Sequence, residues 1–183
     1  MADNPFLAAF GLIAQADPAL FQMLGLSLRV SLSAVAIACL IGLPLGILLV
    51  VTHRDHILPK PALNAALGTA INFLRSIPFI IMLAMLFPVT RAVMGSAIGT
   101  TSVIFPLVVS AFPYIARMVE GSLSEVDRGV IEAAQSMGSS NWQIIRKVLL
   151  PEAVPSLVNG AAISVTTILA YTALDSAAGG GGL

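Results

Sequence analysis

The chain has 183 residues, of which 57% are hydrophobic and only 10% are charged. A soluble domain usually carries about 25% charged residues, so the composition indicates a membrane protein. Nine Lys and Arg residues balance nine Asp and Glu residues, and no basic surface for nucleic acid is therefore expected. The single cysteine, Cys39, lies in an apolar run, which excludes a disulfide framework or a cysteine metal cluster.

The first 27 residues contain Asp3 and Asp17 but no Lys or Arg. They lack the basic segment that a cleavable signal peptide needs. We expect residues 1–27 to form an N-terminal segment on the outer side or at the membrane interface. Insertion then relies on the helices that follow.

Four apolar stretches are long enough to cross a membrane, because a span needs about 20 residues of helix. They cover residues 30–51, 62–90, 92–116 and 153–174, and the second is interrupted by Arg75 alone. Gly and Pro recur inside these stretches, which is tolerated where neighbouring helices satisfy the backbone. The sequence predicts an all-α, polytopic membrane helix bundle with four spans.

The basic residues predict the orientation, because Lys and Arg concentrate in cytoplasmic loops. Arg54 and Lys60 follow the first span and four more basic residues follow the third, whereas the opposite side receives only Arg29 and Arg91. We therefore expect the N-terminus outside and the long connection 117–152 in the cytoplasm.

This long connection carries signals for two short helices. Ser122 with Glu125 fits a capping box, and Gly138 supplies a stop for the helix that follows. Ser140 with Gln143 offers a second cap. The predicted apolar face of the first helix consists of Val130, Ala133, Ala134 and Met137. Periodicity alone leaves two interpretations open, a hairpin that docks on a partner and an amphipathic hairpin that lies on the lipid.

The segment Glu132-Ala133-Ala134, followed by Gly138 and then by Leu150-Pro151, closely resembles the EAA loop of ABC importer permeases. Residues 73–79 (FLRSIPF) and 112–120 (FPYIARMVE) are similar to the corresponding segments of methionine-type members. The resemblance extends from about residue 26 to the last residue. It therefore covers most of the chain.

In that family the EAA loop, here about residues 120–152, is a coupling helix that sits in a cleft of a separate ATPase subunit. The resemblance therefore makes Glu132, Ala133, Ala134, Gly138, Leu150 and Pro151 the candidate coupling residues. Small alanines permit close approach of two surfaces, a Glu can pair with a basic residue, and Gly permits a positive φ at a turn.

The resemblance also implies the partners. They are a second copy of the chain, two ATPase subunits that hold ATP and Mg²⁺, a periplasmic or lipoprotein methionine-binding protein, and the lipid bilayer of the bacterial inner membrane. No phosphate-binding Gly-rich Lys motif occurs in the sequence. The chain itself is therefore expected to bind no cofactor or metal and not to be an enzyme.

Arg75 and Pro78 form a second candidate group, as pathway or structural residues. An unpaired charge in hydrocarbon is costly and by default suggests function. The sequence favours the alternative that residues before Arg75 lie along the cytoplasmic interface, with the span starting near Ser76 and Pro78 and Arg75 reaching lipid headgroups. His53 and His56 are expected in a solvated loop rather than in a metal site.

Methionine-type permeases resemble five-helix subunits, so residues 28–183 are expected to form the permease domain without the last helix of the family. Asp175 also stands where the family more often has a small neutral residue. Two alternatives stay open. One is a permease for another small polar solute or amino acid. The other is a truncated membrane protein that binds the ATPase without transporting.

Overall fold

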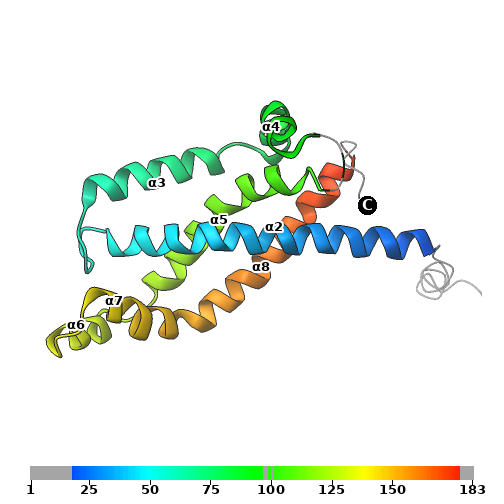
Figure 1. Cartoon of the computed structure of the whole chain (residues 1–183). Coiled ribbons are helices and arrows are strands. Elements are labelled where there is room, and N and C mark those ends of the chain that lie inside the picture. The colour runs from blue at the N-terminus through cyan, green and yellow to red at the C-terminus, as the bar shows by residue number, and fades with distance from the viewer. Residues whose placement is uncertain (1–17, 97–98, 100, 178–183) are drawn as a thin grey trace, which may run out of the picture.

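The computed structural model describes residues 18–96, 99 and 101–177, and within these ranges all regular secondary structure is helical (Figure 1). The elements are α2 Pro18–Val51, α3 Pro61–Arg75, α4 Phe79–Met94, α5 Ile104–Ser124, α6 Arg128–Ser136, α7 Asn141–Ile144, the π-helix η1 Ile145–Leu149 and α8 Leu150–Ala177. The long helices form one bundle, and α6 and α7 gather at one end of it (Figure 1). The predicted all-α bundle is confirmed.

Three described helical segments are long and apolar enough to cross a membrane, at residues 24–51, 104–124 and 141–173. The bent pair α3 and α4 can form a fourth crossing. The first predicted span ends correctly at Val51, but α2 begins at Pro18 and runs without a break through residue 27. Residues 18–27 therefore belong to the first long helix, and Gly25 alone does not interrupt it.

The third predicted span, 92–116, is wrong at its start. Helix α4 ends at Met94, and Gly95 follows it with a φ of 78°, the left-handed conformation that commonly terminates helices. Helix α5 begins only at Ile104 and continues to Ser124. The apolar run thus contains a helix end, a connection and a new helix, which hydropathy alone does not distinguish.

The second predicted span is broken at the expected place. Helix α3 ends at Arg75 and α4 begins at Phe79, and their axes differ by 100°. Pro78 precedes α4 in an extended conformation, with φ −57° and ψ 141°. A proline also disfavours helical geometry in the residue before it, so α3 cannot continue into α4.

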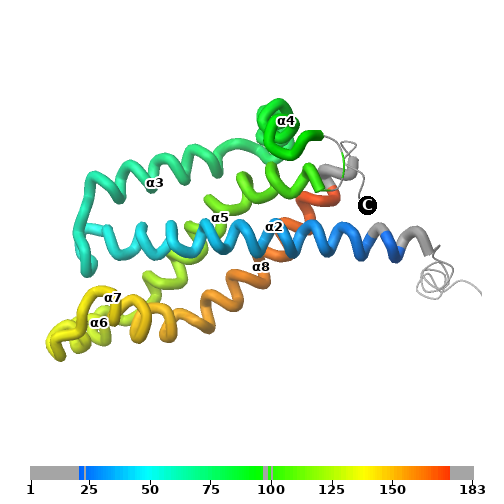
Figure 2. The backbone as a smooth tube through the Cα atoms, viewed as in Figure 1, coloured from blue at the N-terminus to red at the C-terminus, as the bar shows by residue number. Residues whose placement is uncertain are grey.

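Helix α3 does not lie across the end of the bundle. It runs antiparallel to the second half of α2 (Figure 2), and its Leu67 and Ile71 pack with Leu45 and Leu49 of α2. The Asn64 side chain donates a hydrogen bond to the Leu49 carbonyl at 2.6 Å. The interpretation of this segment as lying along the interface is therefore wrong, because α3 shares the path of a spanning helix.

Helices α2 and α5 cross at very short distance, and two glycines of α2 make this possible. A Cβ atom added to Gly42 would lie 2.8 Å from Ile115 Cγ2, and one added to Gly46 would lie 2.6 Å from the Ala116 carbonyl oxygen. Both residues are buried. Two small residues spaced four apart are a general device for close helix packing in membranes.

We predict that Gly46→Ala destabilises the bundle by about 1–3 kcal/mol, because the methyl group would overlap backbone that cannot move without separating α2 from α5. Thermal unfolding of the purified protein in detergent measures this as a lower midpoint. Gly25→Ala on the same helix is the matched control, because nothing lies within 4 Å of its added Cβ. Equal midpoints for the two variants would contradict the prediction.

Candidate functional site

The connection between α5 and α8 forms a compact projection, which we call the knob and define as residues 127–144. Its first helix, α6, starts at Asp127, whose carboxylate accepts a hydrogen bond from the Gly129 N–H at 2.6 Å. The predicted cap at Ser122 and Glu125 is wrong. Ser122 is buried inside α5, and its hydroxyl accepts a hydrogen bond from Ser156 at 3.1 Å, because packing against α8 extends α5 beyond the local capping signal.

Gly138 makes the turn between the two short helices, as predicted. Its φ is 79°, its N–H donates to the Gln135 carbonyl at 2.9 Å, and the Ser139 N–H donates to the Ala134 carbonyl at 3.1 Å. This pair of bonds is a Schellman motif, which requires a left-handed residue after the helix. An added Cβ at Gly138 would meet nothing within 4 Å, so backbone conformation rather than space requires glycine.

The second short helix, α7, begins with the predicted capping box. The Gln143 N–H donates to the Ser140 hydroxyl at 3.4 Å, and the Ser140 N–H donates to the Gln143 side chain at 2.8 Å. Helix α7 then passes through η1 into α8. Pro151 explains the π-helical stretch, because it has no N–H and its ring displaces the carbonyl four residues earlier. Leu150 and Pro151 thus lie where the knob joins α8, and Pro151 is exposed.

The knob has an inner face and an outer face. Ile131 and Ala134 of α6 are buried with Ile144 and Leu149 of the following helix. Ala134 differs from the other residues of the predicted apolar face, since only 3% of it is exposed. Its small size allows α6 to pack on the rest of the chain.

The outer face combines apolar and charged groups. Met137 is 78% exposed and Trp142 is 67% exposed, and Val130 is exposed as well. Glu132 and Ala133 are exposed on α6. Large apolar side chains left in water at the tip of a projection are typical of a surface that a partner covers.

Glu132 forms an ion pair within α6. Its Oε1 lies 3.2 Å from Nε of Arg128, and both side chains are more than half exposed. An exposed pair of this kind contributes only about 0–1 kcal/mol. Glu132 can therefore exchange Arg128 for a cation on another molecule at little cost.

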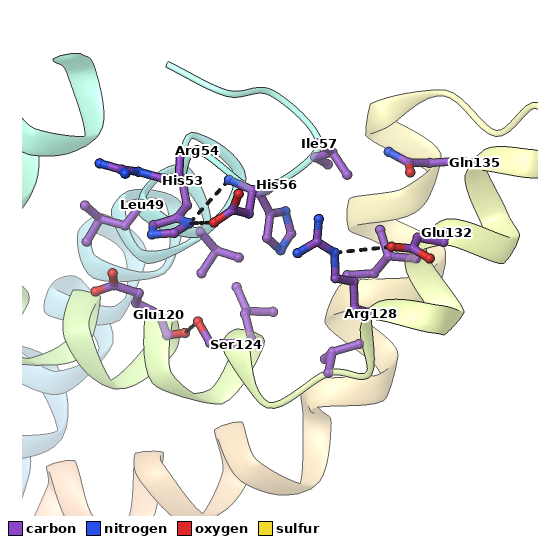
Figure 3. Close-up of a pocket in the computed structure, with 15 residues that line it drawn as sticks. Leu49, His53, Arg54, His56, Ile57, Glu120, Ser124, Arg128, Glu132 and Gln135 are labelled. Atoms are coloured by element: carbon purple, nitrogen blue, oxygen red, sulfur yellow. Dashed lines mark hydrogen bonds and ion pairs between the residues drawn. The ribbon is translucent and has the colours of Figure 1, made fainter. Parts of the chain in front are cut away.

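A cavity of about 610 Å³ separates the knob from the loop between α2 and α3. His53 and His56 reach it from the loop, Glu120 from α5, and Arg128 and Glu132 from α6 (Figure 3). Nδ1 of His53 lies 3.9 Å from Oδ2 of Asp55. Among the described residues, no three His, Cys, Asp or Glu side chains group as a metal site would need.

His56 is less solvated than the sequence predicts. Its Nδ1 is buried without a hydrogen-bond partner among the described residues. Burial lowers the pKa of His56, and the positive charges of His53 and Arg128 lower it further. A proton on His56 would place a new positive charge between the loop and the knob, next to Arg128 (Figure 3).

Because the pKa of His56 is lower in the folded protein, the unfolded chain takes up the proton first as the pH falls through about 6.5, and folding stability decreases. We predict a smaller loss of the detergent unfolding midpoint between about pH 8 and about pH 5.5 for His56→Gln than for the wild type. His53→Gln should keep most of the loss, because burial of His56 remains. An identical pH profile for His56→Gln and wild type would contradict this.

Arg75 and Pro78 lie apart from the knob, at the other end of α3 from the loop. Arg75 lines a second cavity, of about 150 Å³, together with Tyr114 of α5 and Tyr171 of α8. Sequence analysis missed both tyrosines. A signal was present, because they are the only two tyrosines of the chain and both stand in apolar stretches.

Known proteins resemble this chain in sequence. Residues 42–183 match the family described as binding-protein-dependent transport system inner membrane component. The probable D-methionine transport system permease protein of Vibrio cholerae is 45% identical over 148 residues, which are 81% of this chain and 66% of that protein. The corresponding protein of Pasteurella multocida is 44% identical over 91% of this chain and 78% of its own length. The D-methionine transport system permease protein of Escherichia coli is 49% identical over 73% of this chain and 62% of its own length.

Solved structures resemble it as well. A chain in inward-facing conformations of the MetNI methionine ABC transporter has a TM-score of 0.88 and 42% identity, over 91% of this chain and 79% of that one. A chain of an amino acid ABC transporter crystallised with histidines has a TM-score of 0.72 and 21% identity, over 98% of this chain and 78% of that one. This likeness shows a shared fold alone. This chain is therefore a multi-pass bacterial inner-membrane protein that belongs to the family of binding-protein-dependent transport system inner membrane components.

Proposed function

We propose that the chain is the membrane-spanning permease subunit of an ATP-driven importer of L- or D-methionine. The observation that carries the proposal is the knob. It presents Met137 and Trp142 to solvent at one end of a bundle of spanning helices. The names of the relatives described above and of the MetNI structure support methionine as the substrate.

The knob couples the bundle to a separate ATPase. Helices α7, η1 and α8 continue into one another, so that residues 141–173 form one 33-residue rod. Ile131 and Ala134 attach α6 to this rod. A partner that moves the knob therefore tilts α8 against α2 and α5, and such rigid-body movement opens a bundle alternately to its two sides.

The coupling residues divide by position. Glu132 and Ala133 contact the ATPase, because they are exposed on α6. Gly138 holds the turn, and Ala134 holds α6 in place from within. Leu150 and Pro151 transmit the movement where the knob meets α8.

The proposed partners are those of the importers that the chain resembles. The subunit works as a homodimer with two ATPase subunits, which bind ATP and Mg²⁺ and hydrolyse the ATP, and with a periplasmic or lipoprotein methionine-binding protein. The chain itself is no enzyme and holds no cofactor. The knob faces the cytoplasm and the N-terminus faces the periplasm, because Arg128, Arg146 and Lys147 stand at the knob end of the bundle.

We predict ATP-dependent methionine uptake by proteoliposomes that contain this chain with its cognate ATPase and binding protein. Radiolabelled methionine inside the vesicles measures it, and vesicles supplied with a non-hydrolysable ATP analogue are the control. Uptake of a different solute but not of methionine would show that this solute is the substrate. Stable binding of the ATPase without uptake of any solute would contradict transport and favour an interaction protein.

Gly138 offers a separate test of coupling. Gly138→Val places a β-branched residue at a positive φ, at a cost of about 1–3 kcal/mol, so the knob leaves its binding conformation. We predict at least about tenfold weaker association with the ATPase and a parallel loss of uptake. Gly138→Asn is the matched control, since asparagine tolerates the left-handed region. Wild-type association and uptake in Gly138→Val would contradict the proposed role.

A further inference from the structure

The cavity beside Arg75 lies where the break between α3 and α4 meets α5 and α8. Arg75 is the last residue of α3, and Phe79 is the first residue of α4. The other lining residues include Ser110 and Tyr114 of α5 and Tyr171 of α8. Four helices therefore converge on about 150 Å³ of space. Any relative movement of these helices changes its shape.

The cavity lies partway along the bundle, and Arg75 is itself exposed there. Tyr114 stands at the middle of α5, ten residues from either end. Arg75 lies about 21 Å along α3 from Pro61, at 1.5 Å per residue, against a hydrocarbon thickness of about 30 Å. This depth is too great for the Arg75 side chain to reach the membrane surface on the side of the α2–α3 loop.

No described carboxylate neutralises Arg75. The three ion pairs among the described residues involve other side chains. The acidic residues whose side chains the structure describes all lie toward the knob end: Asp55, Glu120, Glu125, Asp127, Glu132 and Glu152. A second copy of the chain offers the same set. The six described carboxylates therefore supply no counter-charge to Arg75, whereas a ligand that carries a carboxylate can supply one.

The surroundings of Arg75 suit a group that carries both charges. The C-terminus of α3 and the N-terminus of α4 both border the cavity, and no side chain caps the N-terminus of α4. Free N–H groups at a helix start favour a carboxylate. The Asn72, Phe73 and Leu74 carbonyls at the end of α3 already accept hydrogen bonds from the following backbone, so this helix end favours an ammonium group through its dipole. Broken helices inside membranes recognise small zwitterions by this pairing.

Two hydroxyl groups complete the cavity. Neither Tyr114 nor Tyr171 forms a hydrogen bond to another described residue. The Tyr171 ring is held in place by stacking on Phe79, with ring centroids 4.8 Å apart and planes inclined by 3°. The two hydroxyls are therefore available to a ligand, and at least one has a fixed position.

We propose that this cavity binds the zwitterionic head group of an amino acid as it passes through the bundle, an inference that rests on the proposed transport function. Arg75 contacts the carboxylate, and the hydroxyls of Tyr114 and Tyr171 donate hydrogen bonds to it. Pro78 is a positioning residue, because it creates the break that brings both helix ends to the cavity. The sequence favours a contact between Arg75 and lipid headgroups. In this proposal Arg75 instead lines the transport pathway.

The test is equilibrium binding of radiolabelled methionine to the purified complex with its ATPase, in nanodiscs and without the binding protein. We expect Arg75→Met to weaken binding by about tenfold or more, because a hydrogen-bonded charge is lost. Methioninol, which lacks the carboxylate, should compete poorly with methionine in the wild type. Arg91→Met, the same exchange on α4 away from the cavity, should bind like the wild type. Association with the ATPase should be unchanged in both variants.

Other outcomes overturn the inference. Equal methionine binding by Arg75→Met and wild type, or equal competition by methioninol, excludes the carboxylate contact. Retention of phosphatidylglycerol by wild type but not by Arg75→Met in native mass spectrometry, with equal methionine binding, assigns Arg75 to a lipid headgroup. Asp175→Asn that abolishes binding to the same extent as Arg75→Met would instead identify a structural ion pair.

Folding of the variants does not limit the test. Tyr171→Phe keeps the ring that stacks on Phe79 and removes only the hydroxyl, so it should weaken methionine binding without affecting assembly.

Failure of the inference and failure of the proposed function are also distinct. Methionine uptake by the wild type with no effect of the cavity variants on binding overturns only the inference. Arg75-dependent methionine binding without uptake overturns only the transport function.

Discussion

The close crossing of α2 and α5 determines where everything else in this chain lies. Gly42 and Gly46 have no side chains, so the backbone of α2 approaches the Ile115 and Ala116 region of α5 directly. In a membrane, contact of this kind replaces the hydrophobic effect as the source of helix association, because lipid is as apolar as the side chains. The fixed angle between α2 and α5 then sets both the position of the knob and the position of the cavity beside Arg75.

Arg117 links this crossing to the other candidate sites. Its guanidinium donates to the Gly68 carbonyl of α3 at 2.9 Å and pairs with Glu120 at 2.6 Å. The same turn of α5 therefore holds α3, which ends at Arg75, and borders the cavity next to the knob through Glu120. The knob and Arg75 are thus both linked to this one segment of helix, and the proposed coupling of a partner ATPase to transport requires such a link.

Local signals predicted some elements well and others poorly. The Gly138 turn and the Ser140 cap were confirmed because each depends only on neighbouring residues. The Ser122 cap failed because contact with Ser156 of α8 keeps α5 helical. Sequence analysis did not separate Ala134 from the other residues of the predicted apolar face, because helical spacing does not tell which side of a short helix meets its own chain.

Sequence by itself determined that the chain has several apolar helices long enough to cross a membrane, that a turn at Gly138 joins two short helices, and that a helix breaks before Pro78. Composition, spacing and proline geometry are properties of a few adjacent residues, so they need no partner. Only the tertiary structure decided that α3 lies along α2 and that Arg75, Tyr114 and Tyr171 meet at one cavity. Those residues stand far apart in the chain, and the packing of four helices brings them together.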